Sequence, residues 1–471
     1  MGWEMDKNPG SVKRNILDRP GRGGMREMTA LALPMVISHG CETALIFTDR
    51  LFLARLGPAS MNAAMAGGLT AFMMMTFFIG LTGYVTALAA QYLGAGRKEG
   101  CALVVSQAAL ISLLATPVIL ALRPLAHLLF RIMDLPMEQL EPQRIYFDIL
   151  LYGAILVMLR NCLSCFFSGI GRTRVVMVSA MVAMLVNAAA NYVLIFGKLG
   201  LPALGIRGAA WGTLFGSFCA FLVLLAAYLG RGNRREYKVP AALRFDREVM
   251  AKLLRFGSPA GVEMFLNLLA FTVMIMIFHG HGPVTATAVT IVFNWDLVSF
   301  VPLLGIQIGV VSLVGRYVGA GRPDIAERAT RSGLKMACAY SLMILVLFVS
   351  LPGELVSVFE PREADAIFSR ATPLATTMVR LAAFYVLADA VMLVYSGALR
   401  GAGDTFWAMC ASVALHWLLV PALILFLKVL ALPPQSAWLV LIAFLLCFSG
   451  LFYLRYRGGK WKTLAVVREG G

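Results

Sequence analysis

Five acidic residues lie away from the ends of long apolar segments of the chain, where a charged group is costly. Glu42 and Asp49 are seven residues apart, so a helix places them on one face, two turns from each other. Glu263, Asp296 and Asp389 occupy separate apolar segments further along. A carboxyl group in such surroundings favours its neutral form and exchanges protons, or it holds a monovalent cation where amide and hydroxyl oxygens converge with it. Either chemistry couples an ion gradient to a conformational change, and the negative surface favours cationic substrates.

Asparagines accompany the acids in the same apolar segments. Asn267 follows Glu263 by four residues, which is one helical turn on the same face. Asn187 and Asn191 have the same spacing in another segment. Their side-chain oxygens are of the type that would complete a site for a proton or a small cation around a carboxylate.

Three arginines also lie within apolar segments, namely Arg50, Arg160 and Arg380. The alternative to a coupling role is therefore that the acids neutralise these arginines in buried ion pairs, with Glu42 and Asp296 as the first candidates. If the segments enclose a polar cavity instead, we expect its lining to include Glu42, Arg160, Asn161, Asn267 and Asp296.

The composition requires a membrane around these segments. Of 471 residues 59% are hydrophobic and 14% charged, whereas soluble proteins are about 45–50% apolar and about 25% charged. A span needs roughly 20 apolar residues. The composition excludes a secreted disulfide scaffold, a disordered chain and a nucleic-acid-binding domain. We predict an all-α integral membrane protein with twelve transmembrane helices, at 29–54, 62–93, 102–122, 145–170, 175–197, 208–230, 253–280, 285–316, 333–352, 371–399, 405–430 and 436–455.

The distribution of positive charge predicts the topology. Of the 41 Lys and Arg residues, 29 lie in the two terminal segments and the connections on their side, and nine lie in the alternate connections. Positive residues concentrate on the cytoplasmic side of a membrane, so both termini are expected in the cytoplasm. The polar, basic N-terminal segment has no apolar core directly after its charges and is interpreted as a tail, not a leader.

The chain repeats itself at an offset of 225 residues. GLTGYVTALAAQYLGAGR from Gly80 aligns without a gap on GIQIGVVSLVGRYVGAGR from Gly305. We predict two six-helix lobes, related by a pseudo-twofold axis along the membrane normal, as in alternating-access transporters. A larger scaffold built by duplication is the alternative, but the charges inside the spans argue against it. The predicted parts are a tail at 1–28, an N-lobe at 29–230, a linker at 231–252, a C-lobe at 253–455 and a tail at 456–471.

Pro34 and Pro259 occupy equivalent positions early in the first and seventh spans. Proline removes a hydrogen bond from a helix, so both are candidate hinges. Cys162 and Cys165 form a CxxC without a second pair, and we expect them to pack in the core. We predict no metal site and no cofactor apart from the coupling ion.

Several motifs in order resemble the multidrug and toxic compound extrusion (MATE) family, in its bacterial NorM-like and DinF-like branches. They are the proline with FTDRLFLARLG, the LGAGR and VGAGR loops, NAAANYVLIFG with PALGIRGAAWGT, and DAVMLVYSGALRGAGDT, over residues 29–455. The resemblance implies that Asp49 is the carboxylate of the first span that binds a proton or cation, with Asn187 and Thr213 beside it. Asn191 stands where many relatives have Asp. Ser164 stands where an Asn is usual, and Asn161 is one turn earlier.

For the C-lobe, the resemblance implies that Asp389 is the aspartate of the tenth span. The glutamate that the family has in the seventh span is Asn267 here, and Glu263 lies one turn away as a replacement. Arg50, directly after Asp49, is not part of the family pattern. It either acts on Asp49 or points elsewhere.

These observations predict a secondary-active efflux antiporter that exports organic, cationic compounds in exchange for H+ or Na+. We expect a monomer in the bacterial inner membrane, in contact with membrane lipids and without a nucleic-acid partner. One alternative is a flippase for lipid-linked sugars or polysaccharides of the same superfamily. Another is a membrane-embedded transferase, although no suitable cluster of His, Asp or metal ligands is present in the sequence. No GxxxxGK[ST] motif occurs, which argues against an ATP-driven pump.

Overall fold

The computed structural model describes residues 21–132, 136–361, 365–464 and 466–467, and every regular element in this part of the chain is a helix. The predicted tails lie partly outside the described residues. The first half contains α2 (Met25–Ala54), α3 (Pro58–Gly83), α4 (Val85–Gly94), α5 (Lys98–Ala121), α6 (Arg123–Ile132), α7 (Met137–Tyr152), α8 (Ala154–Gly169), α9 (Thr173–Phe196), α10 (Ile206–Leu229), α11 (Arg231–Glu236) and η1 (Val239–Ala242). The second half contains α12 (Arg247–His279), α13 (Pro283–Gly319), α14 (Pro323–Ser350), α15 (Pro352–Ser357), α16 (Ala366–Ala402), α17 (Thr405–Ile424), η2 (Leu425–Val429), α18 (Pro434–Arg457) and η3 (Lys460–Thr463).

The predicted spans are confirmed in number and approximate position. Among the described residues, 11 helices are long and apolar enough to cross a membrane, and the bent pair α7 and α8 makes up to 12. These two helices meet at Gly153 with an angle of 49°. The seventh span begins earlier than the predicted limit of the linker, because Asp246 caps α12 by accepting a hydrogen bond of 3.0 Å from the Val249 N–H.

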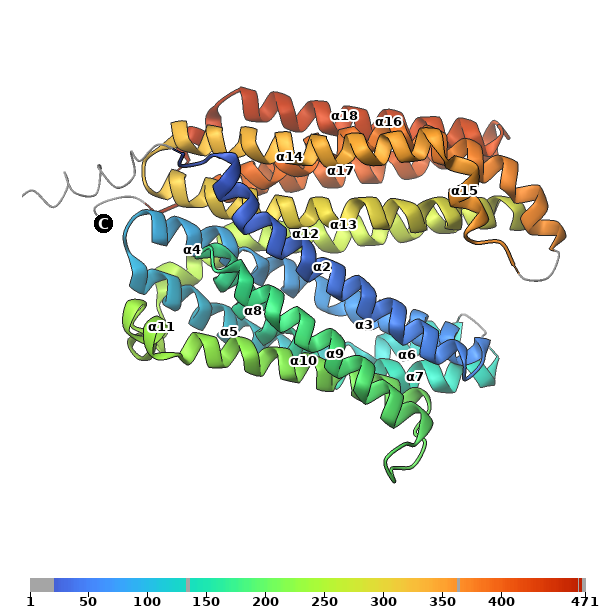
Figure 1. The fold of residues 1–471 in the computed structure, drawn as a ribbon, viewed down its shortest axis with the longest axis horizontal. Coiled ribbons are helices and arrows are strands. Elements are labelled where there is room, and N and C mark those ends of the chain that lie inside the picture. Colours follow the sequence, from blue (N-terminus) through green and yellow to red (C-terminus); the bar gives the residue numbers. More distant parts are fainter. Residues whose placement is uncertain (1–20, 133–135, 362–364, 465, 468–471) are drawn as a thin grey trace, which may run out of the picture.

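The two halves of the chain form two groups of helices. In Figure 1, α12 to α18 lie in the upper part of the molecule and α3 to α11 in the lower part, with α2 running obliquely between them. Helix α2 packs against both α9 and α13. The internal repeat is visible in matching turns, since α3 and α13 each begin with proline after a glycine of positive φ, 123° at Gly57 and 112° at Gly282.

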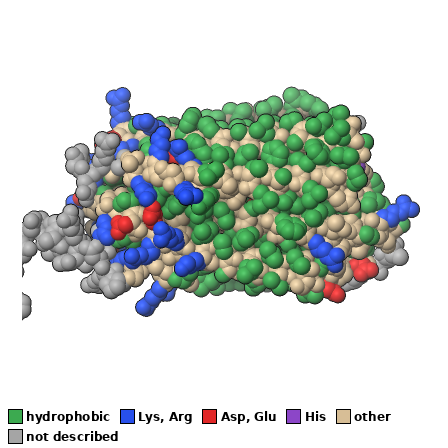
Figure 2. Space-filling view, turned by 90° about the horizontal axis from the view of Figure 1, so that it is seen from above, with side chains coloured by type: hydrophobic (Ala, Val, Ile, Leu, Met, Phe, Trp, Pro, Cys, Tyr) green, Lys and Arg blue, Asp and Glu red, His purple; other side chains and the backbone are tan. Residues whose placement is uncertain are grey.

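The surface has the distribution of side chains expected across a bilayer. Figure 2 shows hydrophobic side chains along most of the length of the helices and Lys and Arg gathered toward one end. We call this end, which holds α11 and η3, the basic end. The opposite, distal end holds α15 and the α9–α10 connection (Figure 1).

Polar contacts tie the two halves together near the basic end. The Tyr317 hydroxyl of α13 donates a hydrogen bond of 2.7 Å to Glu27 in the first turn of α2. The Gln91 amide of α4 donates one of 2.8 Å to the carbonyl of Gly401 in α16. A side chain at Gly319 would collide with the backbone of Gln91, so glycine is required for this close approach. The two groups of helices are therefore in direct contact at this end.

Candidate functional site

Asp49 lies at the centre of a buried polar cluster formed by α2, α9 and α10. Its side chain is in the last two turns of α2, and the residue is 7% exposed. The Asn191 amide donates to Oδ1 of Asp49, and the Thr213 hydroxyl lies 3.1 Å from Oδ2. The Asn187 amide donates to Thr213 at 3.3 Å, and its oxygen accepts from Asn191 at 3.3 Å. The structure therefore brings together all four residues that the sequence suggested for this site.

Helical spacing and one glycine explain how these groups meet. Asn187 and Asn191 are one turn apart in α9 and present their amides to the same neighbours. The Thr213 hydroxyl is also 3.0 Å from the carbonyl of Ala209, so it is shared between its own helix and Asp49. Gly212 lies against the Asn191 side chain, where an added Cβ would collide with the amide. The missing side chain lets α10 approach α9 closely enough for Thr213 to reach Asp49.

Arg50 does not take part in this cluster. It is exposed, whereas Asp49 beside it is buried. Within the described residues, no Lys, Arg or His forms an ion pair with Asp49. The second of the two expectations for Arg50, that it points elsewhere, agrees with this geometry.

The acidic residues of the second half form two separate groups. Glu263 is buried and forms an ion pair of 2.7 Å with Arg400, near the end of α16. Asp389, also buried in α16, has Asp296 of α13 as its electrostatic neighbour, and Tyr385 is close to both carboxylates. The sequence analysis grouped Asp389 with Glu263 and Asn267. In the structure, the acidic neighbour of Asp389 is Asp296, and Glu263 is paired with Arg400.

Sequence reasoning missed several of these partners. Arg400 lies just beyond the predicted span at 371–399, but in the structure it lies inside α16. Asn267 donates a hydrogen bond of 2.7 Å to Ser412 of α17, a contact without any signal in the sequence. Tyr385 could have been found, since it precedes Asp389 by one helical turn.

The polar residues predicted to line a cavity do not all meet: Asn267 and Asp296 lie in α12 and α13, whereas Glu42, Arg160 and Asn161 lie where α2, α3 and α8 pack together. Arg160 of α8 contacts Glu42 of α2 at 3.4 Å, so one of the predicted acid–arginine pairs is present. Asn161 donates to the Thr82 hydroxyl at 3.1 Å and turns toward α3. Ser164 is half-buried, and its carbonyl accepts a hydrogen bond from Ser168.

The two candidate hinge prolines lie within uninterrupted helices. Pro34 is inside α2 and Pro259 inside α12, and both are buried. Among the described residues, no group of three or more His, Cys, Asp or Glu side chains is arranged to hold a metal ion. Cys162 and Cys165 are free thiols in α8.

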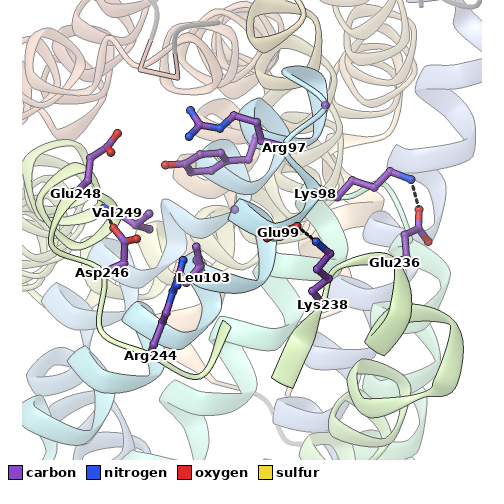
Figure 3. Close-up of a pocket in the computed structure, with 13 residues that line it drawn as sticks. Arg97, Lys98, Glu99, Leu103, Glu236, Lys238, Arg244, Asp246, Glu248 and Val249 are labelled. Atoms are coloured by element: carbon purple, nitrogen blue, oxygen red, sulfur yellow. Dashed lines mark hydrogen bonds and ion pairs between the residues drawn. The ribbon is translucent and has the colours of Figure 1, made fainter. Parts of the chain in front are cut away.

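A cavity of about 430 Å³ lies at the basic end, away from the acidic clusters. Both positively and negatively charged side chains line it. Lys98 forms an ion pair with Glu236 at 2.8 Å, and Lys238 forms one with Glu99 (Figure 3). The hydrogen bond from Lys98 holds the pKa of Glu236 below its ordinary value. These pairs join the first turn of α5 to the segment between α10 and α12, so we interpret the region as structural.

Two groups of membrane-spanning helices, joined at one end and carrying buried acidic clusters in both halves, define the chain as a membrane transporter of internally repeated architecture. The MatE family model matches residues 34–193 and 259–424. The chain belongs to this family, the MATE family of multidrug efflux transporters, and is a transporter and not an enzyme. The fold and the family that the sequence suggested are confirmed.

Individual relatives are similar over most of their length. The chain is 27% identical over 398 residues to "Multidrug resistance protein PmpM" of Pseudomonas aeruginosa, covering 84% of this chain and 82% of that protein. It is 25% identical to "Probable multidrug resistance protein NorM" of Thermotoga maritima, with 94% of each covered. A solved structure described as the outward-facing conformation of a multidrug resistance MATE family transporter of the MOP superfamily matches with a TM-score of 0.85 at 20% identity, over 94% of this chain and 97% of that one.

Proposed function

We propose that the protein is a secondary-active antiporter that exports organic, cationic compounds in exchange for H+ or Na+ by alternating access. Membership of the MATE family and relatives named as multidrug resistance proteins support the export of small organic molecules. The coupling chemistry must come from side chains of this chain. Asp49 and its three neighbours are our first candidates for that role.

The observation that carries the proposal is a buried carboxylate in a membrane span, Asp49, which forms no ion pair with any Lys, Arg or His of the described residues. An ionised carboxylate in this position is costly unless hydrogen bonds or a cation compensate for it. In the structure, Asn191 and Thr213 act as donors toward the two oxygens of Asp49. Donors suit a carboxylate that alternately releases and takes up a proton, whereas for Na+ the Asn191 amide would have to turn its oxygen toward the ion and only the Thr213 hydroxyl already presents one. The hydrogen bonds therefore favour H+ as the coupling ion.

Helix α2 connects Asp49 to the contact between the lobes, so protonation of Asp49 acts on that contact through α2. A proton on either carboxylate oxygen displaces one donor and loosens the connection of α2 to α9 and α10. The same helix binds α13 at its other end through Glu27 and Tyr317. Pro34 lies between these two points and is proposed as the place where α2 bends. A change at Asp49 would thereby weaken the closed contact at the basic end.

The pair of Asp296 and Asp389 is proposed as a second coupling position. Two neighbouring carboxyl groups in a buried site cannot both ionise without a large cost, so a proton or a cation bound there would stabilise the pair. Glu263 is engaged by Arg400. We therefore assign the C-lobe coupling role to Asp389 with Asp296, and a positioning role to Glu263.

The remaining expectations form part of the same proposal. The concentration of Lys and Arg at one end favours a cytoplasmic basic end, with both termini on that side of a bacterial inner membrane. The lobes are proposed at 29–230 and 253–455, and the protein is expected to act as a monomer.

Transport in reconstituted vesicles tests the proposal. Purified protein is placed in vesicles with an imposed proton or sodium gradient, and the movement of several fluorescent organic cations is followed. Gradient-dependent accumulation, strongest with protons, is expected. If neither gradient drives any of the cations, the antiporter proposal fails and the flippase alternative is favoured.

A further inference from the structure

A second cavity, of about 270 Å³, opens between α14 and α18 in the second half of the chain. Both helices pack against α16, which contributes Tyr395 to the lining (Figure 1). Arg331 is in the third turn of α14 and Arg457 is the last residue of α18, and both line the cavity. The cavity therefore lies at the basic end, where the apolar surface of the spans gives way to Lys and Arg (Figure 2).

The charged groups around this cavity leave an excess of positive charge. Among the described residues that line it, Glu327 is the one acidic side chain. Glu327 forms an ion pair with Lys462 of η3, and Arg331 is further from it, at 3.8 Å. Arg457 forms no ion pair with a carboxylate of the described residues. Both arginines are exposed, so two guanidinium groups are available to an anion.

Three tyrosines add hydrogen-bond donors to the same cavity. The ring of Tyr395 lies 5.5 Å from that of Tyr453 and 4.8 Å from that of Tyr456, and all three residues line the cavity. The hydroxyl group of Tyr456 is buried and has no hydrogen-bond partner among the described residues. A buried donor without an acceptor is costly, and an oxygen atom of a bound group would supply one. The lining is therefore suited to a ligand rich in anionic oxygens.

We propose that this cavity binds the headgroup of an anionic phospholipid, with the phosphate between Arg331 and Arg457. The planar guanidinium group of arginine matches the geometry of phosphate oxygens, and basic pockets between spans are suited to lipid headgroups. The excess of positive charge favours a lipid with a net negative charge, because the ammonium group of a zwitterionic lipid would be repelled by the same arginines. This site is independent of the proposed export function and adds a specific lipid ligand to it.

Exposed apolar side chains continue from the cavity along both helices, which favours a lipid over a soluble anion. Leu342 follows Arg331 by eleven residues, about three helical turns, so it lies on the same face of α14, and it is 55% exposed. Leu446 precedes Tyr453 by seven residues, about two turns, on the same face of α18, and it is 50% exposed. Acyl chains attached to a phosphate in the cavity would cover these side chains.

Lipid binding to the full-length protein in detergent tests the inference. Native mass spectrometry measures the Kd for phosphatidylglycerol and for phosphatidylcholine with the same acyl chains, and the melting temperature is followed in parallel. We expect phosphatidylglycerol to bind more tightly and to raise the melting temperature, since a ligand of the folded state stabilises it. Arg331→Gln and Arg457→Gln should each raise the Kd for phosphatidylglycerol about tenfold, because each removes a charge-assisted hydrogen bond to the phosphate.

Matched controls separate a specific site from general attraction to positive charge. Arg174→Gln removes an exposed arginine in the first turn of α9, outside the cavity, and should leave the Kd unchanged. Tyr456→Phe removes a hydroxyl without a partner, so it should weaken lipid binding while the lipid-free protein keeps its melting temperature.

Three results would overturn the site. They are equal Kd values for the two lipids, unchanged binding in both arginine variants, and an equal loss of binding in Arg174→Gln. Glycerol 3-phosphate, a soluble form of the headgroup, distinguishes a lipid from a free phosphate. If it raises the melting temperature at the same concentration as phosphatidylglycerol, the cavity binds a soluble anion and the assignment to lipid is wrong.

Discussion

Thr213→Val removes one hydroxyl group from the Asp49 cluster while nearly preserving the shape of the side chain. Thr213 lies 3.1 Å from Oδ2 of Asp49 and 3.0 Å from the carbonyl of Ala209, so its single proton is shared. A full hydrogen bond to a charged group contributes about 1.5–3 kcal/mol, and a shared one belongs at the lower end. The ionised form of Asp49 should therefore lose about 1.5 kcal/mol of stabilisation, which corresponds to about a factor of ten.

The direction of the effect depends on the coupling ion. If H+ is the coupling ion, the variant destabilises the ionised form of Asp49 relative to the protonated form. Asp49 then binds its proton more tightly, so the proton concentration for half-maximal export should fall about tenfold. With sodium coupling, the Thr213 oxygen is lost as a ligand, so the sodium concentration for half-maximal export should rise. Our account predicts the first result.

The assay follows dye export from vesicles over a series of imposed proton and sodium gradients. Thr213→Ser retains the hydroxyl and serves as the matched control, with wild-type ion dependence expected. If the valine variant has the same dependence on both ions as the wild type, Thr213 does not act on the coupling group and the reasoning is refuted.

Two further variants test contacts that the structure introduced. Glu263→Gln leaves the charge of Arg400 unpaired. Breaking a buried ion pair typically lowers the free energy of unfolding by roughly 3–5 kcal/mol. Because Arg400 is 32% exposed, we expect a smaller decrease of about 1–3 kcal/mol. The melting temperature in detergent should fall and recover when Arg400→Gln is added, and an unchanged melting temperature of the single variant would contradict the positioning role. Tyr317→Phe removes the 2.7 Å bond to Glu27 and should shift the protein away from the state closed at the basic end. Distances between spin labels on α2 and α13 measure this shift, and identical distributions in the variant and the wild type would argue against a closing role.

The sequence was sufficient for the fold because the hydrophobic segments are long and the repeat is strong. Spacing also identified Asn187 and Asn191 as one polar face, the resemblance added Asp49 and Thr213, and the structure shows the four side chains in contact. Pairing between distant spans could not be predicted, since Glu263 had no visible reason to prefer Arg400 over any other partner. Asp296 was predicted as a cavity residue, and its position beside Asp389 depends on how α13 packs on α16. Such tertiary contacts carry no periodic signal in a single sequence.

Proton-driven export by Asp49→Asn tests the central claim most directly. Asparagine keeps the size of the side chain and can still form hydrogen bonds with its neighbours, but it cannot take up and release a proton. In vesicles with an inward proton gradient, we predict that the variant folds and binds the organic cation but shows no gradient-driven export. Export at the wild-type rate, with the wild-type dependence on the proton gradient, would contradict the proposal that Asp49 couples transport to the ion gradient.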